Sequence, residues 1–141
     1  MAYYEGLPIY RAAMDVVLAV EAEVKAFSRF HKYQVGARLR DAALECVRLV
    51  ALAQRREGRL AAVTSLCEKV DELQLYVNVG REVKAFGSIQ KAISVMEKVV
   101  VLARQAEGWR KSVAASAPRA DGVVSSPRMG PDPARPESIR R

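Results

Sequence analysis

Residues that do chemistry are scarce in this 141-residue chain, which has one histidine and two cysteines. The single His31 cannot supply the paired Glu-x-x-His ligands of a di-iron helical bundle, nor a dedicated base for Ser65 or Ser94. Cys46 and Cys67 are 21 residues apart and form no Cys-x-x-Cys pair, which argues against a zinc site. The glycines are too isolated for a phosphate-binding loop. We therefore predict no enzymatic activity, no metal and no cofactor.

Long apolar runs are also lacking. The first thirty residues contain four acidic residues and no continuous apolar stretch, so we expect no signal peptide. No segment reaches the about 18–20 uncharged apolar residues that cross a bilayer. Cys46 and Cys67 each lie in a helical apolar register, which predicts buried thiols in a reducing compartment. We expect a cytoplasmic protein with no membrane contact.

Four segments carry apolar residues at the spacing of amphipathic helices, and no segment has a strand pattern. The predicted helices run from Pro8 to Phe27, from about Tyr33 to Arg56, from Leu60 to about Lys84, and from Ser88, the N-cap, to Trp109–Lys111. Short connections between long helices favour antiparallel neighbours, and hence an all-α, up-down-up-down four-helix bundle. The side chains predicted to face the core in the first three helices are Ile9, Ala13, Val16, Val20, Val24, Phe27, Leu39, Ala42, Cys46, Val50, Ala53, Leu60, Val63, Cys67, Val70, Leu73, Val77 and Gly80.

The composition changes at residue 112. Five of the six prolines follow this position, among serine, glycine and arginine. Such a segment buries too little apolar surface to offset its loss of conformational entropy. We predict a bundle domain over residues 1–111 and a disordered tail over residues 112–141.

The fourth predicted helix has two apolar stripes, rotated by roughly 100° from each other. The first stripe is predicted to face the bundle core and contains Ile89, Ile93, Met96, Val100 and Ala103. The second is predicted to be an interface between copies of the chain and contains Val95, Val99, Leu102 and Ala106. A helix that is apolar on two faces must bury both, so the pattern predicts a homo-oligomer.

Positive charge exceeds negative charge by seven. Such an excess suits a polyanion, whereas the alternative is that the cations only promote solubility and complement helix dipoles. Arg48 and Arg55 are seven residues apart on the second predicted helix, which places them on one stripe. The candidate binding residues for nucleic acid or a polymerase are Arg38, Arg40, Arg48, Arg55, Arg81, Lys84, Lys91 and Arg104.

Aromatic residues mostly flank the predicted helix ends. There they can cap the core, which we expect, or stack on nucleic-acid bases, which is the alternative. The residues concerned are Tyr3, Tyr4, Tyr10, Phe30, Tyr33, Phe86 and Trp109.

Three features resemble a known family over about residues 7–111. The run from Phe27 to Arg40 looks like the junction between the first two helices of a group of small four-helix-bundle proteins. The ending Ala103–Lys111 is similar to a Gly-Trp-basic ending, and the third helix carries leucines and Gly80 where the family has leucines and a small residue. The group includes the 23S ribosomal RNA intervening-sequence proteins and the accessory variability determinant (Avd) of diversity-generating retroelements, whose branch the ending matches.

The resemblance implies a homopentameric, positively charged barrel without enzymatic activity. It also implies association with a reverse transcriptase and its template RNA, in support of mutagenic retrohoming. Contacts to RNA or DNA would be made to the backbone, with low sequence specificity. Two alternatives stay open: a ribosomal-RNA-associated bundle, and a protein-interaction scaffold that binds no nucleic acid.

Overall fold

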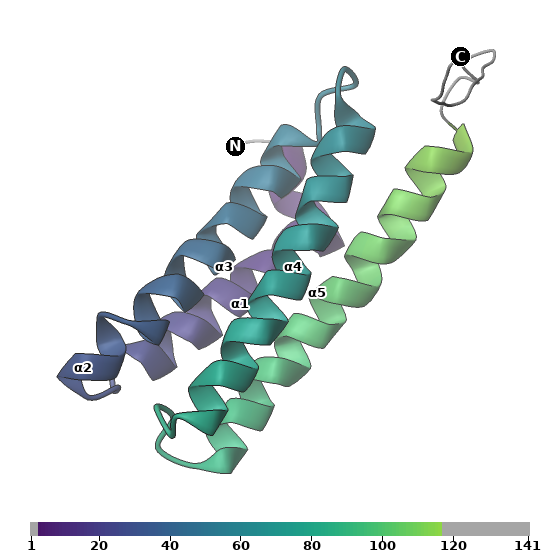
Figure 1. Ribbon diagram of the computed structural model, residues 1–141. Helices are drawn as coiled ribbons and strands as arrows, with labels where there is room; N and C mark the ends of the chain where they lie inside the picture. The colour runs from purple at the N-terminus through teal and green to yellow at the C-terminus, as the bar shows by residue number, and fades with distance from the viewer. Residues whose placement is uncertain (1–2, 117–141) are drawn as a thin grey trace, which may run out of the picture.

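The computed structural model describes the backbone of residues 3–116 and the side chains from residue 5 onward (Figure 1). The described chain is all-helical and contains no strand. Its elements are a 3₁₀ turn, η1 (Tyr3–Gly6), four long helices, α1 (Pro8–Val24), α3 (Val35–Leu52), α4 (Arg59–Glu82) and α5 (Ile89–Ser116), and a one-turn helix, α2 (Arg29–Lys32).

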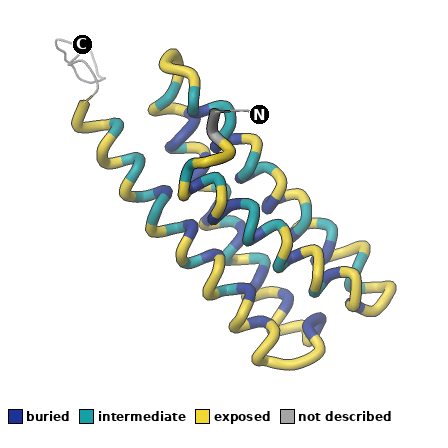
Figure 2. Tube along the Cα trace, turned by 180° about the vertical axis from the view of Figure 1, so that it is seen from behind, coloured by how far each residue is buried: buried dark blue, intermediate teal, exposed yellow. Residues whose placement is uncertain are grey.

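The four long helices form a helical bundle. Helix α1 packs against α3 and α5, and α4 packs against the same two helices, so the contacts close a ring around one core. Figure 1 shows these helices side by side, with the one-turn α2 at one end of the bundle. Buried positions lie on the inward sides of the helices, and the connections are mostly exposed (Figure 2).

Local chemistry explains where the helices begin and end. Pro8 occupies the start of α1, where its missing N–H costs nothing. The Ser88 hydroxyl oxygen accepts a hydrogen bond from the backbone N–H of Lys91 at 3.3 Å, which confirms Ser88 as the N-cap of α5. The Arg59 guanidinium donates to the carbonyl oxygens of Ala53 and Gln54 at 2.8 and 2.7 Å. These bonds satisfy carbonyls just beyond α3, which ends at Leu52, four residues before the predicted end.

The predicted core is confirmed throughout the first two long helices and most of the third. Every predicted inward position of α1 and α3 is buried, together with Phe27 and Ala53, which lie just beyond them. In α4, however, Leu60 is exposed and Cys67 is only half-buried. Leu66, which lies between the predicted positions, is fully buried instead.

The prediction for the two stripes of α5 is wrong, because the faces are exchanged. Val95, Val99, Leu102 and Ala106 are at most 1% exposed and belong to the core of the single bundle. Of the stripe expected inside, Ile89 and Ile93 are 59% and 43% exposed. The other members of that stripe are half-buried: Met96, Val100 and Ala103. Both stripes have helical spacing, so spacing cannot choose between them. The turn before α5 makes the choice, since Ala85 and Phe86 are buried and Ala92 and Val95 follow inward.

Helix α5 also continues five residues beyond the predicted end of the domain at residue 111. Its last turn reaches Ser116, and Val113 packs against a small apolar cluster that contains Ala53 and Val63. The start of the predicted tail is therefore helical. Residues 117–141, the rest of that tail, lie outside the described residues.

Gly36 allows α3 to pass close to α1 and α2. A methyl group added there by Gly36→Ala would lie 2.8 Å from Cγ1 of Val24 and 3.0 Å from the carbonyl oxygen of His31. Overpacking of this kind costs about 1–3 kcal/mol. We therefore expect Gly36→Ala to lower the melting temperature measured by circular dichroism.

Gly108 provides the matched control, since no heavy atom lies within 4 Å of the Cβ that Gly108→Ala would add. Alanine is favoured over glycine inside a helix by roughly 0.5–1 kcal/mol, so this variant should melt at the parent temperature or above it. A Gly36→Ala protein that melts no lower than the parent would contradict the close approach.

Candidate functional site

Three of the eight predicted binding residues already face a carboxylate. Nε of Arg40 lies 2.6 Å from Oε1 of Glu21 on α1. Arg48 pairs with Glu45 one turn earlier, at 2.6 Å. The contact of Arg81 with its neighbour is looser, at 3.6 Å, and that partner, Glu82, is largely exposed. Arg40 and Arg48 are therefore weaker candidates for an anion site than the sequence suggests.

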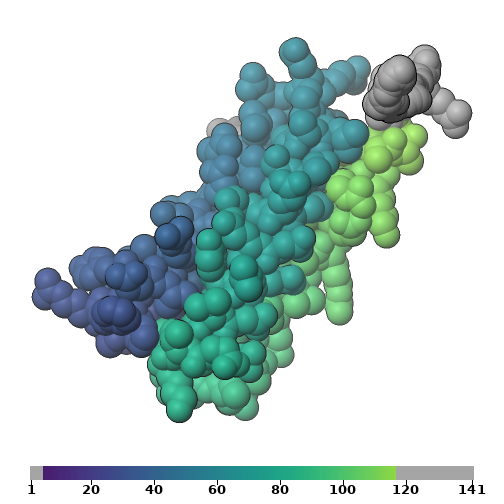
Figure 3. All heavy atoms as spheres, in the orientation of Figure 1, coloured from purple at the N-terminus to yellow at the C-terminus, as the bar shows by residue number. Residues whose placement is uncertain are grey.

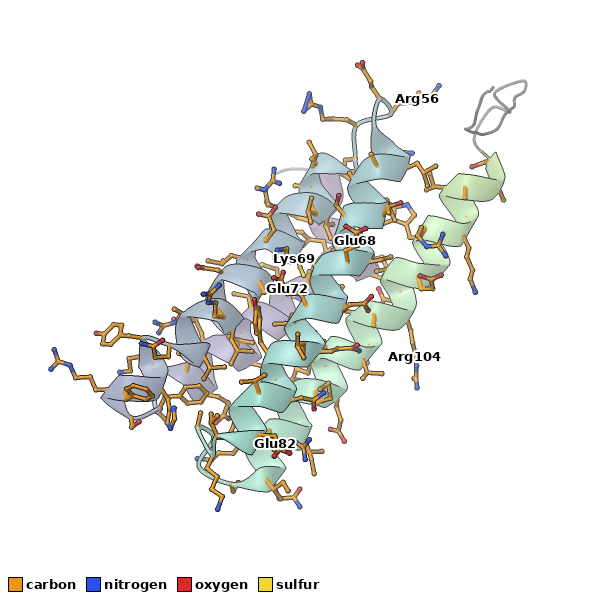
Figure 4. The ribbon with its side chains drawn as sticks, in the orientation of Figure 1. Arg56, Glu68, Lys69, Glu72, Glu82 and Arg104 are labelled. Atoms are coloured by element: carbon orange, nitrogen blue, oxygen red, sulfur yellow. The ribbon has the colours of Figure 1, made fainter. Side chains whose placement is uncertain are left out.

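The other five make no ion pair within the described part of the chain. Arg38 lies near the acidic Glu72, and Arg55 lies beyond the end of α3 rather than on one helical stripe with Arg48. Arg104 points away from the bundle on the outer side of α5 (Figure 4). These three are far apart along the structure. Of the remaining two, Lys84 lines a hollow together with Arg81, and Lys91 lies over Gly87 of the same hollow.

A groove at the α4–α5 turn is lined by two of the candidates, Arg81 and Lys84, and a third, Lys91, lies over the turn beside it. Two adjoining hollows share Arg81, Ile89 and Ala92. One of them reaches Lys84 and Phe86 in the turn, and the other follows Val77, Asn78, Ile93 and Met96 along the two helices. The Lys91 ammonium lies over the turn, 3.2 Å from the position of a Cβ built on Gly87. We call Arg81, Lys84 and Lys91 the basic rim; within the described residues Arg81 pairs with Glu82, and neither lysine makes an ion pair.

Lys84 adopts an uncommon backbone conformation. Its φ is +61°, and within the described residues it is the one non-glycine position in the left-handed region. The backbone N–H of Ala85 donates to the carbonyl oxygen of Gly80 at 2.9 Å, which is the pattern of a helix end that glycine normally occupies. The chain therefore places a cation at the rim at some conformational cost.

Aromatic packing beneath the turn holds the rim in place. The rings of Phe27 and Phe86 meet edge to face, with centroids 5.2 Å apart and planes at 84°. Gly80 makes room for this contact, because a Cβ there would lie 2.8 Å from Cε2 of Phe86. The turn is thus anchored in the core, while its cations remain exposed.

The face between α3 and α4 is charged but nearly balanced. In Figure 4, Glu68, Lys69 and Glu72 lie on the α4 side of this face. The Lys69 ammonium donates a hydrogen bond to the Glu72 carboxylate, and this bond lowers the pKa of Glu72. A hydrogen bond from Tyr76 lowers the same pKa by a smaller amount. Four acidic and three basic side chains line the two hollows here, so the face has no cationic excess: Arg38, Asp41, Glu45, Arg48, Glu68, Lys69 and Glu72.

Neither cysteine is set up as a nucleophile. Burial raises the pKa of Cys46 to about 12, so its thiol stays protonated at neutral pH. Burial also raises the pKa of Cys67, which is half-buried rather than buried as predicted. Among the residues that the structure describes, no group of three or more histidine, cysteine and acidic side chains could hold a metal ion.

Two aromatic residues expected to cap the core do not do so. Phe30 and Tyr33 are 69% and 67% exposed, whereas Phe27 and Phe86 fill the core at this end of the bundle. No acidic residue occurs between Glu23 and Asp41, but this signal does not separate Phe30 and Tyr33 from the buried Phe27, which lies in the same stretch.

No protein-family model and no curated protein sequence matches this chain. Over the described residues, none of the helices combines the length and apolar character required to span a membrane.

Replacing Lys84 by glycine should stabilise the fold. The left-handed conformation costs an ordinary residue roughly 1–2 kcal/mol and glycine very little. Part of that gain is offset by the greater freedom of glycine in the unfolded chain. We expect Lys84→Gly to raise the free energy of unfolding, measured by urea titration, by about 0.5–1 kcal/mol.

Lys84→Ala is the matched control, because it removes the same charge but keeps a Cβ in the left-handed region. Its stability should stay near that of the parent. Equal stabilisation by both variants would assign the gain to relief of charge repulsion and not to the backbone.

Proposed function

We propose that this protein is a non-enzymatic accessory factor of a diversity-generating retroelement, acting in the cytoplasm. It binds the reverse transcriptase and its template RNA, or DNA, through cationic side chains and so supports mutagenic retrohoming. The resemblance of residues 7–111 to the Avd branch supports the retroelement part of the proposal. The observation that carries the binding part is the basic rim at the α4–α5 turn, whose two lysines make no ion pair within the described residues.

The rim suits phosphate recognition for three reasons. Its cations are exposed, and the one ion pair they make within the described residues is the loose contact of Arg81 with Glu82. It is anchored by the buried Phe86, so less order must be gained on binding. Lys84 keeps a conformation that glycine would adopt more easily, and such strain is common where a side chain has a function. Flexible amines of this kind bind phosphates as point charges, which favours contacts to the backbone over recognition of base edges.

We also propose that the bundle has up-down-up-down order and assembles with copies of itself, as the pentamer that the family resemblance implies. The short connections and the ring of helix contacts support the antiparallel order. Exposed apolar side chains on α4 and α5 support assembly: Leu75 and Val79 on α4, and Ile89 and Ile93 beside the groove on α5. We propose these residues in place of the interface that the sequence predicted, because the predicted residues are buried in the core of the single bundle: Val95, Val99, Leu102 and Ala106.

Nucleic-acid affinity should fall steeply as salt rises, and the rim should set part of the slope. Each lost phosphate contact lowers the log–log salt slope by about 0.7–0.9. The double variant Lys84→Gln, Lys91→Gln should therefore lower the slope by roughly 1.4–1.8, measured by fluorescence anisotropy with a labelled RNA.

The matched control is Arg40→Gln with Arg48→Gln, which removes the same formal charge. Both arginines already face a carboxylate, so this variant should change the slope much less. A flat salt slope for the parent, or equal effects of the two double variants, would overturn the role of the rim. The reverse transcriptase of the same locus should co-purify with the parent protein; if none does, the retroelement assignment fails.

Assembly should depend on the exposed apolar strip of α5, which consists of Ile89 and Ile93. Ile93→Glu places a charge on this strip and should shift the mass measured by light scattering toward a single chain. Leu44→Glu, at an exposed position on α3, is the control and should leave the mass unchanged. A parent protein that is monomeric at micromolar concentration would contradict the proposed assembly.

A further inference from the structure

The segment Arg29–Tyr33, which we call the α2 corner, carries two exposed aromatic rings. They are Phe30 and Tyr33, and within the described side chains no other aromatic residue is exposed. The remaining aromatics are buried in the core or half-buried against it. Exposed rings that play no part in the core call for another explanation, and a binding surface is one.

The α2 corner is also strongly cationic. Arg29 and Lys32 of the corner, and Lys25 at the end of α1 four residues before it, make no ion pair within the described residues, and no acidic residue lies between Glu23 and Asp41 in the sequence. Arg40, the last cation of this stretch, is held by its pair on α1. The corner thus combines aromatic rings with cations that lack counter-charges, which is the composition of surfaces that bind single-stranded nucleic acid.

Packing holds the corner in one conformation. Gly36 lets α3 approach the backbone of His31, at 3.0 Å from the position of a Cβ. The Lys32 N–H donates to the carbonyl oxygen of Ser28 at 2.8 Å. Phe30 lies edge to face with His31, with ring centroids 5.4 Å apart. The segment projects from the end of the bundle in Figure 1 and in the space-filling view (Figure 3).

We propose that the α2 corner binds unpaired bases of single-stranded RNA or DNA. Phe30 and Tyr33 stack on bases, while Lys25, Arg29 and Lys32 contact the adjoining phosphates. This inference rests on the proposed nucleic-acid binding and adds a preference for single strands over duplexes. In a duplex the base faces are covered by their neighbours, so exposed rings have nothing to stack on.

The test compares two labelled single strands of about twelve nucleotides, a length within the range of small single-strand sites. One is oligodeoxythymidine, and the other has the same backbone but abasic sugars. The parent protein should bind the strand with bases more tightly. Phe30→Ala with Tyr33→Ala should weaken binding to that strand by about 5-fold or more and leave the abasic strand nearly unaffected.

Two further variants make the comparison specific. Phe30→Tyr with Tyr33→Phe retains both rings and should bind like the parent. Leu44→Ala removes an exposed apolar side chain from α3, away from the corner, and should also bind like the parent. Both altered residues of the alanine variant are exposed, so its circular dichroism melt should match that of the parent.

The possible failures are distinguishable. If the parent binds neither strand at low salt, the proposed function fails and this inference fails with it. If the parent binds both strands equally, binding is electrostatic and only the stacking proposal is wrong. If the alanine variant loses both strands equally, the rings do not act through the bases, and the stacking proposal is wrong as well. If the alanine variant keeps its strand preference but no longer binds the reverse transcriptase, the corner is a protein-binding surface and the proposal is overturned.

Discussion

The contact among Phe86, Gly80 and Phe27 holds together one end of the molecule. The Phe86 ring occupies the space that a side chain at position 80 would fill, and it meets the edge of Phe27 from the other connection. This packing joins the α4–α5 turn to the end of α1. It also sets the rotation of α5, because the buried turn leads directly into its inward-facing residues. Which face of α5 belongs to the core therefore depends on a turn.

Because of the same contact, each of the two connections has a buried apolar part that supports the fold and an exposed cationic part that is free to bind. Apolar residues of each connection enter the core, and the cations beside them stay exposed. In the α4–α5 turn this leaves the basic rim, and in the α2 corner it leaves cations together with two aromatic rings. Both surfaces are built on anchored backbone, so binding would order little that is not already ordered.

Elsewhere on the bundle the charges largely neutralise one another. Arg40 and Arg48 face carboxylates, and the α3–α4 face carries slightly more acids than bases. The positive excess of the chain is therefore not spread evenly over the described surface. Ion pairs at such exposed positions contribute little to stability, but they do reduce the charge available to a polyanion. Ion pairing thus leaves only a few of the eight predicted basic residues available to bind a polyanion.

The sequence by itself determined the helices and most of the core. Helical spacing identified the inward residues of α1 and α3, and Ser88 identified the start of α5, because these signals are local along the chain. Tertiary structure decided the rest. It decided that Val95 and not Ile93 lies inside, that Arg40 is paired across helices with Glu21, and that Phe30 is exposed. Each of these depends on distances between residues far apart in sequence, and no periodicity along one helix records such distances.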